Sequence, residues 1–328
     1  MTCLTASAPG KVIVAGEYAV LDGAPAICMA VNRHARISIS PSDDSQHHVT
    51  APGYLATSRD FVSISEVADE LPLLAAVWQS LPAFSAGFLK IDLDSSEFRD
   101  SSGSKIGLGS SAAVAVASTA ALSQYTSAET DIRDTAMSAH REFQGGSGSG
   151  ADIACSHAGG VIEYRMQFGD CPELSWPADL HYALLWSGQS ADTATQLDKL
   201  AATESSASRM ALAEAASVVA SAWRVGDAEE ISAMLAQYTD TLRRFDVDHR
   251  LGIFDAGHAE LADTVADQVV YKPCGAGGGD LGIAVSTRES ALKEFVAVAQ
   301  SRQFEPLGLE LESTGVVVTR NDVEGNEW

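Results

Sequence analysis

The stretch Lys105-Ile106-Gly107-Leu108-Gly109-Ser110-Ser111-Ala112-Ala113 runs directly into an almost unbroken apolar segment, 114–122. The apolar segment predicts a buried helix, and the stretch before it predicts the start of that helix. Glycines let the backbone approach a ligand closely, and serines commonly cap helices, so we expect the two serines to cap this one. Since a helix start offers unpaired N–H groups and a positive dipole end, the stretch indicates an anion site with Lys105 at its mouth. A glycine-rich turn before a buried helix is the alternative if the stretch is taken alone.

The composition describes an acidic globular protein. The 328 residues are 46% hydrophobic and carry a formal net charge of −23, which argues against nucleic acid or an anionic membrane as the main partner. No apolar run approaches the ~20 residues that span a bilayer. The five cysteines are scattered without a CxxC pair, as in proteins of a reducing compartment. We therefore expect a cytoplasmic protein that binds small molecules and neither nucleic acid nor membrane, with a homodimer as a candidate assembly.

Strand-like and helix-like segments are mixed along the chain, which predicts an α+β fold rather than a regular parallel βαβ array. Thr126 and Glu129 have the spacing of a capping box and predict a helix that continues to about Phe143. An irregular stretch at 165–181 carries two prolines and separates two halves of different pattern. We place a domain boundary there, so that the expected domains are 1–175 and 176–328.

Three clusters that contain glycine occur in a fixed order. They are Ser7-Ala8-Pro9-Gly10-Lys11-Val12-Ile13-Val14-Ala15-Gly16-Glu17-Tyr18, the central 107–113, and Gly275-Ala276-Gly277-Gly278-Gly279-Asp280. Together they resemble the GHMP small-molecule kinase family over essentially the whole chain. Within that family, the segments 16–21, 144–152 and 275–284 are similar to phosphomevalonate kinases, which make 5-diphosphomevalonate from 5-phosphomevalonate and ATP in isoprenoid synthesis.

The resemblance implies a fold, a nucleotide and a metal. The fold would be a two-domain GHMP kinase fold, with an N-terminal domain like ribosomal protein S5 domain 2, a ferredoxin-like C-terminal domain and an active site in the cleft between them. ATP would be a co-substrate and Mg²⁺ the cofactor. The implied ATP-binding residues are Gly107, Leu108, Gly109, Ser110, Ser111 and Ala112. Ser111 and Glu142 are the implied metal ligands, although a solvated helix carboxylate is an equal interpretation of Glu142.

The resemblance also assigns catalytic and acceptor-binding residues. Lys11, Asp152 and Lys105 would lie at the reacting centre. The implied acceptor-binding residues are Ser149, Gly150, Thr193, Gly275, Ala276, Gly277, Gly278, Gly279 and Asp280. Arg141, Lys272 and His34 are further candidates to meet the charges of the acceptor.

Phosphoryl transfer mainly needs positioning and neutralisation of charge, and a mobile lysine such as Lys11 suits that task. The acceptor decides what Asp152 does. A phosphate is already ionised near pH 7, so Asp152 would then orient Lys11 or a metal, whereas an alcohol would make it a proton acceptor. The plain alternatives are an ordinary strand lysine and a carboxylate that caps the helix beginning near Ile153.

Three functions fit these residues. The first is ATP-dependent phosphorylation of 5-phosphomevalonate, the second is a mevalonate kinase or another GHMP alcohol kinase, and the third is a GHMP-fold sensor that binds ligands without turnover. Retention of both Lys11 and Asp152 argues against the sensor, because a sensor needs neither. We therefore expect a phosphotransferase whose acceptor is the phosphate of 5-phosphomevalonate.

Overall fold

Two long antiparallel strands, β1 (Thr2–Ala15) and β2 (Ala26–Pro41), form the centre of the first sheet. The computed structural model describes residues 2–82, 87–146, 148–167, 171–191, 193–201, 206–265 and 268–322. The strand order is β12-β1-β2-β5-β3-β4, and β6 pairs with β2 and with β7. The remaining bounds are β3 (His47–Thr50), β4 (Arg59–Phe61), β5 (Leu89–Asp94), β6 (Val161–Tyr164), β7 (Glu173–Leu174) and β12 (Val317–Asp322).

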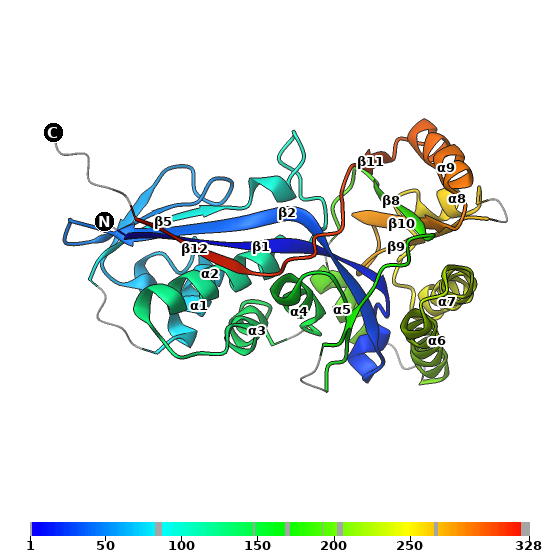
Figure 1. Cartoon of the computed structure of the whole chain (residues 1–328), viewed down its shortest axis with the longest axis horizontal. Helices are drawn as coiled ribbons and strands as arrows, with labels where there is room; N and C mark the ends of the chain where they lie inside the picture. Colours follow the sequence, from blue (N-terminus) through cyan, green and yellow to red (C-terminus); the bar gives the residue numbers. More distant parts are fainter. Residues whose placement is uncertain are drawn as a thin grey trace.

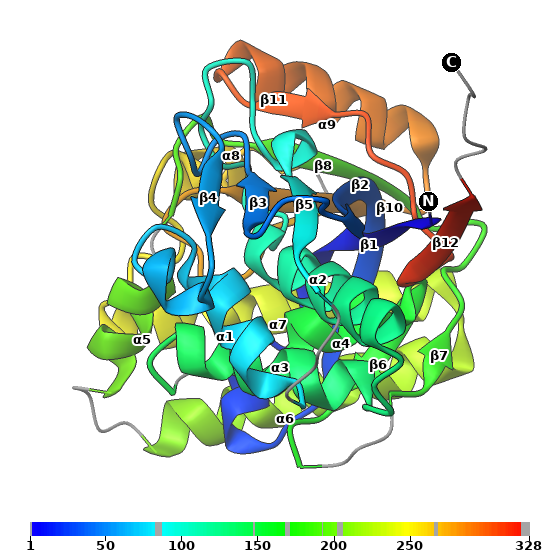
Figure 2. The ribbon, with the colours of Figure 1, turned by 90° about the vertical axis from the view of Figure 1, so that its left-hand side faces the viewer.

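One face of this sheet is covered by helices. They are α1 (Pro72–Ser80), α2 (Ser110–Thr126), α3 (Ile132–Phe143) and α4 (Ala151–Ala158). Figure 1 shows them on one side of β1 and β2, and Figure 2 shows the same layering from the end of the molecule. The helix α2 packs against both strands and against the other three helices, and every residue from Ala112 to Ser123 is buried. The apolar segment therefore forms the buried helix that its sequence predicts.

Two predicted caps are wrong. The N-cap of α2 is Gly109, whose φ of 76° is left-handed, so Ser110 and Ser111 are the first helical residues and do not cap the helix. Thr126 ends α2, where its hydroxyl donates a hydrogen bond to the carbonyl of Leu122 and is not available to start a new helix. The next helix, α3, instead begins after Asp131, whose carboxylate accepts from the N–H of Asp134.

A second, antiparallel sheet has the order β11-β8-β10-β9. Its strands are β8 (His181–Trp186), β9 (Val270–Pro273), β10 (Leu281–Ser286) and β11 (Glu305–Leu307). The helices of this half are α5 (Thr193–Ala201), α6 (Ser206–Val225), α7 (Ala228–His249), α8 (His258–Ala262) and α9 (Glu289–Ser301). In Figure 1, α6 and α7 lie together at the end of the molecule that is opposite the N-terminus. The mixed sheets and helices confirm the α+β class.

The predicted boundary between 175 and 176 falls after β7 and before β8, between strands of the two sheets. The last described strand crosses back, because β12 pairs with β1 from Thr2↔Asp322 to Ser7↔Val317. The division into domains therefore stays a prediction. Within the described residues, no helix has the length and apolar character that a membrane crossing requires.

Candidate active site

A cavity of about 400 Å³ opens where β1, the starts of α2 and α4 and the loop after β9 meet. The predicted site residues that line it are Lys11, Lys105, Gly107, Leu108, Gly109, Ser110, Ser111, Ser149, Asp152, Gly275, Ala276 and Asp280. Residues of the first sheet and its helices and loop residues of the second half therefore contribute to one cavity. Both helices face it with their N-terminal ends, so unpaired backbone N–H groups and two positive dipole ends converge there.

The lysine of β1 lies across the start of α2. The N–H of Lys11 donates to the carbonyl of Leu108 at 2.9 Å, which fixes the strand against the glycine loop. A Cβ placed on Gly109 would lie 2.7 Å from Lys11 Cε, so any larger residue there would displace the lysine. The left-handed conformation of Gly109 excludes most other residues for a second reason. The glycine thus brings an ammonium group to the anion-binding end of α2.

Asp280 joins the glycine loop to the second half of the chain. Its carboxylate lies so close to Gly107 that a Cβ there would be 2.6 Å from Asp280 Cγ. One carboxylate oxygen accepts from the N–H of Ala191 at 3.1 Å. Burial raises the pKa of Asp280, while the Ala191 N–H and the charges of Lys11 and Lys105 act in the opposite direction. The carboxylate therefore connects three segments at the mouth of the cavity.

The start of α4 presents a second group of predicted residues. Gly150 is the N-cap with a φ of 84°, and a Cβ there would lie 2.9 Å from Met137 Cε. The hydroxyl of Tyr164 donates to the carbonyl of Ser149 at 2.7 Å. Asp152, in the first turn of the helix, is half-buried and faces the cavity. These contacts fix the backbone that leads into the helix and thereby the place of Asp152.

The sequence gives no sign of His140, which lies behind the glycine loop. Its ring is buried, and Nε2 lies 3.0 Å from the hydroxyl of Ser111, 29 residues away in the chain. Burial lowers the pKa of His140, which favours the neutral ring. No local spacing connects the two residues, because α2 and α3 become neighbours only in the folded chain.

Comparison with known proteins agrees with this geometry. Residues 74–160 match the model of the GHMP kinases N-terminal domain. The phosphomevalonate kinase of Streptomyces sp. strain CL190 is 31% identical over an alignment that covers 87% of this chain and 90% of the relative. The chain belongs to the GHMP kinase family. A mevalonate kinase of Methanothermobacter thermautotrophicus is 33% identical over 48% of this chain and 49% of the relative.

Solved structures share the fold of this GHMP kinase family member. The Lin0012 protein from Listeria innocua superposes with a TM-score of 0.84 at 23% identity, and the match covers 97% of this chain and 99% of the Lin0012 chain. The Streptococcus pneumoniae phosphomevalonate kinase, solved in complex with phosphomevalonate and AMPPNP, has a TM-score of 0.80 at 19% identity and covers 94% of this chain and 99% of its own. The GHMP fold that the sequence resembles is thereby confirmed.

The donors at the cavity suit Mg²⁺ bound together with a nucleotide. Magnesium at such sites takes one or two protein ligands, and phosphates and water complete the octahedron. The hydroxyl of Ser111 and the carboxylate of Asp152 line the cavity, so this donor set fits. No cluster of three histidine, cysteine or acidic residues that could hold a metal occurs among the described residues. Glu142 is exposed on α3 and is not among the residues that line the cavity, so the geometry gives its expected metal role no support.

Several residues expected at the site lie outside the cavity lining. Ala112 is buried inside α2. The three glycines before Asp280 support the loop from behind: Gly277 packs on Ile253, Gly278 on Gln196 and Gly279 on Gln189. Thr193 begins α5, but its side chain lies outside the part that the structure describes, and so does Asp192.

Lys272 cannot meet the charges of an acceptor. Its side chain is 1% exposed and forms an ion pair with Glu17, whose side chain is also 1% exposed. Tyr238 on α7 donates a 2.9 Å hydrogen bond to the same carboxylate and accepts one from the N–H of Gly16 at 3.0 Å. The group links the end of β1 to β9 and α7 and lies directly beneath the cavity, which Glu17 also lines. The expectation that Lys272 contacts substrate is therefore wrong.

Proposed function

We propose that this chain transfers the γ-phosphoryl group of ATP to the phosphate of 5-phosphomevalonate and releases 5-diphosphomevalonate and ADP. The observation that carries the proposal is the convergence of two helix N-termini and two lysines, Lys11 and Lys105, on one cavity. Each helix start can hold one anionic group, and the reaction brings two such groups together.

On the nucleotide side, the backbone N–H groups of 107–111 would bind the phosphates of ATP. Lys11 would neutralise the charge that develops on the transferring phosphoryl group, since its side chain already lies over the start of α2. Mg²⁺ would supply further charge neutralisation, with Ser111 and Asp152 as its protein ligands. Lys105 is exposed at the mouth of the cavity, where it can meet an incoming anion.

On the acceptor side, no strong base is required. A phosphate monoester has its second pKa near 6, so an oxygen of 5-phosphomevalonate is ionised at pH 7 and can attack the γ-phosphorus as the bond to the β-phosphate oxygen breaks. Gly148 and Ser149 line the cavity before α4 and would bind the acceptor phosphate. Asp152, in the first turn of α4, would orient Lys11.

One long match supports this acceptor. The Streptomyces phosphomevalonate kinase matches 87% of this chain, although another phosphomevalonate kinase and a mevalonate kinase each match 48%. A mevalonate kinase remains the second candidate, because it needs the same glycine loop and would use Asp152 to accept the proton of the alcohol. The two-domain division, a cytoplasmic location and a homodimer belong to the same proposal on sequence grounds.

One assay separates the candidates. The purified chain is incubated with MgATP and either 5-phosphomevalonate or mevalonate, and ADP is followed while phosphorus NMR identifies the product. A diphosphate signal from 5-phosphomevalonate supports the proposal. Turnover of mevalonate alone would assign the chain to the alcohol kinases, and no ADP with either acceptor would leave ligand binding as its function.

A further inference from the structure

A single buried hydroxyl connects the helix that carries Asp152 to the strand that carries Lys11. Ser156 lies one helical turn after Asp152 on α4, so both side chains project from the same side of the helix. Its hydroxyl is completely buried and donates a 2.6 Å hydrogen bond to the carbonyl of Pro9, 147 residues earlier in the chain. Pro9 precedes Lys11 by two residues on β1, so the bond links a side chain one turn from Asp152 to the backbone two residues before Lys11.

The carbonyl of Pro9 needs a partner because the sheet is irregular at this point. The pairing of β1 with β12 ends at Ser7↔Val317, and the pairing with β2 shifts register between Pro9 and Gly10. A buried carbonyl without a partner is costly. Ser156 therefore satisfies a backbone group that the sheet ladder leaves open.

The segment around Lys11 is held on its other side by the glycine loop. The N–H of Lys11 bonds to the carbonyl of Leu108, and a Cβ on Gly10 would lie 2.8 Å from Phe98 and 3.0 Å from that same carbonyl. Residues Pro9 to Lys11 of β1 are thus held between α4, through the Ser156 hydrogen bond, and the glycine loop before α2. The position of Lys11 relative to Asp152 depends on the Ser156 hydrogen bond, because Ser156 and Asp152 lie on the same helix.

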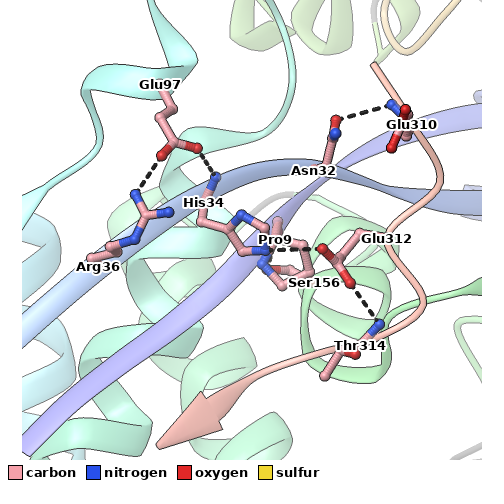
Figure 3. Close-up of polar contacts among 9 residues, drawn as sticks. All are labelled: Pro9, Asn32, His34, Arg36, Glu97, Ser156, Glu310, Glu312 and Thr314. Atoms are coloured by element: carbon pink, nitrogen blue, oxygen red, sulfur yellow. Dashed lines mark hydrogen bonds and ion pairs between the residues drawn. The ribbon is translucent and has the colours of Figure 1, made fainter. Parts of the chain in front are cut away.

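The far end of α4 is anchored separately by the segment before β12. The N–H of Val316 bonds to the carbonyl of His157, and the N–H of Gly160 bonds to the carbonyl of Glu312. Figure 3 shows this segment, with Glu310, Glu312 and Thr314, crossing beside Pro9 and Ser156. Because these bonds hold the C-terminal end of α4, loss of the Ser156 hydroxyl leaves the helix attached and removes the hydrogen bond that sets the position of Asp152 relative to β1.

We propose that Ser156 is a positioning residue that fixes Asp152 relative to Lys11 through its hydrogen bond to the Pro9 carbonyl. The inference rests on the proposed function in that it takes Lys11 and Asp152 as the reacting pair. It predicts that Ser156→Ala lowers kcat about tenfold or more, because small displacements of catalytic groups reduce rates strongly. The affinity for MgATP stays within about twofold, since the glycine loop is untouched.

The test is a double-mutant cycle with a matched control. Ser118→Ala is the control, because Ser118 is an equally buried serine on the neighbouring helix α2 whose hydroxyl has no hydrogen-bond partner among the described residues. kcat is measured for Ser156→Ala, Asp152→Asn and the double variant, and MgATP binding is measured by calorimetry. If Ser156 acts through Asp152, Ser156→Ala changes kcat by less than about twofold once Asp152 is already asparagine. Ser118→Ala leaves kcat unchanged.

Three results would overturn the inference: an unchanged kcat in Ser156→Ala, the same fold loss in both backgrounds, or an unchanged kcat in Asp152→Asn. Should Ser156→Ala fail to fold, Ser156→Cys keeps a similar side-chain shape and replaces the hydroxyl with a weak donor, and it enters the same cycle. The cycle uses whichever acceptor the unmodified enzyme turns over. Failure of 5-phosphomevalonate as a substrate would therefore end the proposed function and leave the role of Ser156 testable with mevalonate.

Discussion

Replacement of Lys272 by methionine should strongly destabilise the fold. The ammonium group pairs with Glu17 across 255 residues of sequence, and both side chains are 1% exposed. Methionine is about as long as the lysine side chain without its ammonium group, so the change removes the charge and keeps most of the packing. Glu17 would then be buried without its charged partner, with the hydroxyl of Tyr238 as its remaining side-chain donor among the described residues.

The expected size follows from this burial. Removal of one partner of a buried ion pair costs about 3–5 kcal/mol, and native domains are stable by about 5–15 kcal/mol. At about 2 °C for each kcal/mol, which suits a chain of this length, Tm should fall by about 6–10 °C. The double variant Glu17→Gln, Lys272→Met leaves no unpaired charge and should regain about half of the loss or more.

Urea unfolding followed by fluorescence measures these differences, and Lys293→Met is the matched control. Lys293 pairs with Glu289 at 2.7 Å, but the two side chains are 72% and 61% exposed, so its loss should leave the stability almost unchanged. The reasoning is refuted if Lys272→Met destabilises the chain no more than Lys293→Met, or if the double variant is less stable than Lys272→Met alone.

Three further predictions concern the glycine loop, the lysine and the effect of pH. Gly107→Ala should raise KM for MgATP about tenfold, because its Cβ would lie 2.5 Å from Asp280. Gly103→Ala is the control: Gly103 has a similar φ of 88°, but a Cβ there would meet nothing within 4 Å, so KM should stay unchanged. Steady-state kinetics check this pair, and an equal effect of the two would refute it. Lys11→Ala should lower kcat at least about hundredfold with a smaller change in KM, and an unchanged kcat would remove the lysine from the mechanism. Burial lowers the pKa of His258 from 6.5 to about 4, so the unfolded chain takes up a proton first as pH falls. The stability that neutral His258 supports is complete above about pH 6.5 and is lost toward pH 4, and the loss amounts to about 3 kcal/mol. Urea unfolding across this pH range should detect the loss. The variant His258→Asn should show a smaller loss over the same range.

Local patterns predicted the parts of the site that lie within one element. The glycine loop before α2 lines the cavity, and so do Gly148, Ser149 and Asp152 around the start of α4, as expected from helix starts. The same patterns failed where a cap depends on backbone conformation: Gly109 caps α2 because its left-handed φ turns the chain into the helix, although serine is the commoner cap. Thr126 had the spacing of a capping box, but its hydroxyl bonds back to Leu122 inside the helix that it ends.

The contacts that organise the cavity join residues too distant in the chain for any spacing to suggest them. Lys272 follows Tyr271 on a strand and precedes the glycine cluster at 275–279, so the sequence favours a substrate contact. The structure shows instead that the Lys272 ammonium group pairs with Glu17, just after β1, and so links the two halves of the chain. The same reasoning applies to Ser156, which in sequence is one small polar residue in a short helix. It gains a role because the register shift at Pro9 leaves a carbonyl open at the place where α4 crosses β1. In this fold the groups proposed to touch substrate are readable from local motifs, while the groups that hold them in place are set by irregularities of the sheet, which the sequence does not encode locally.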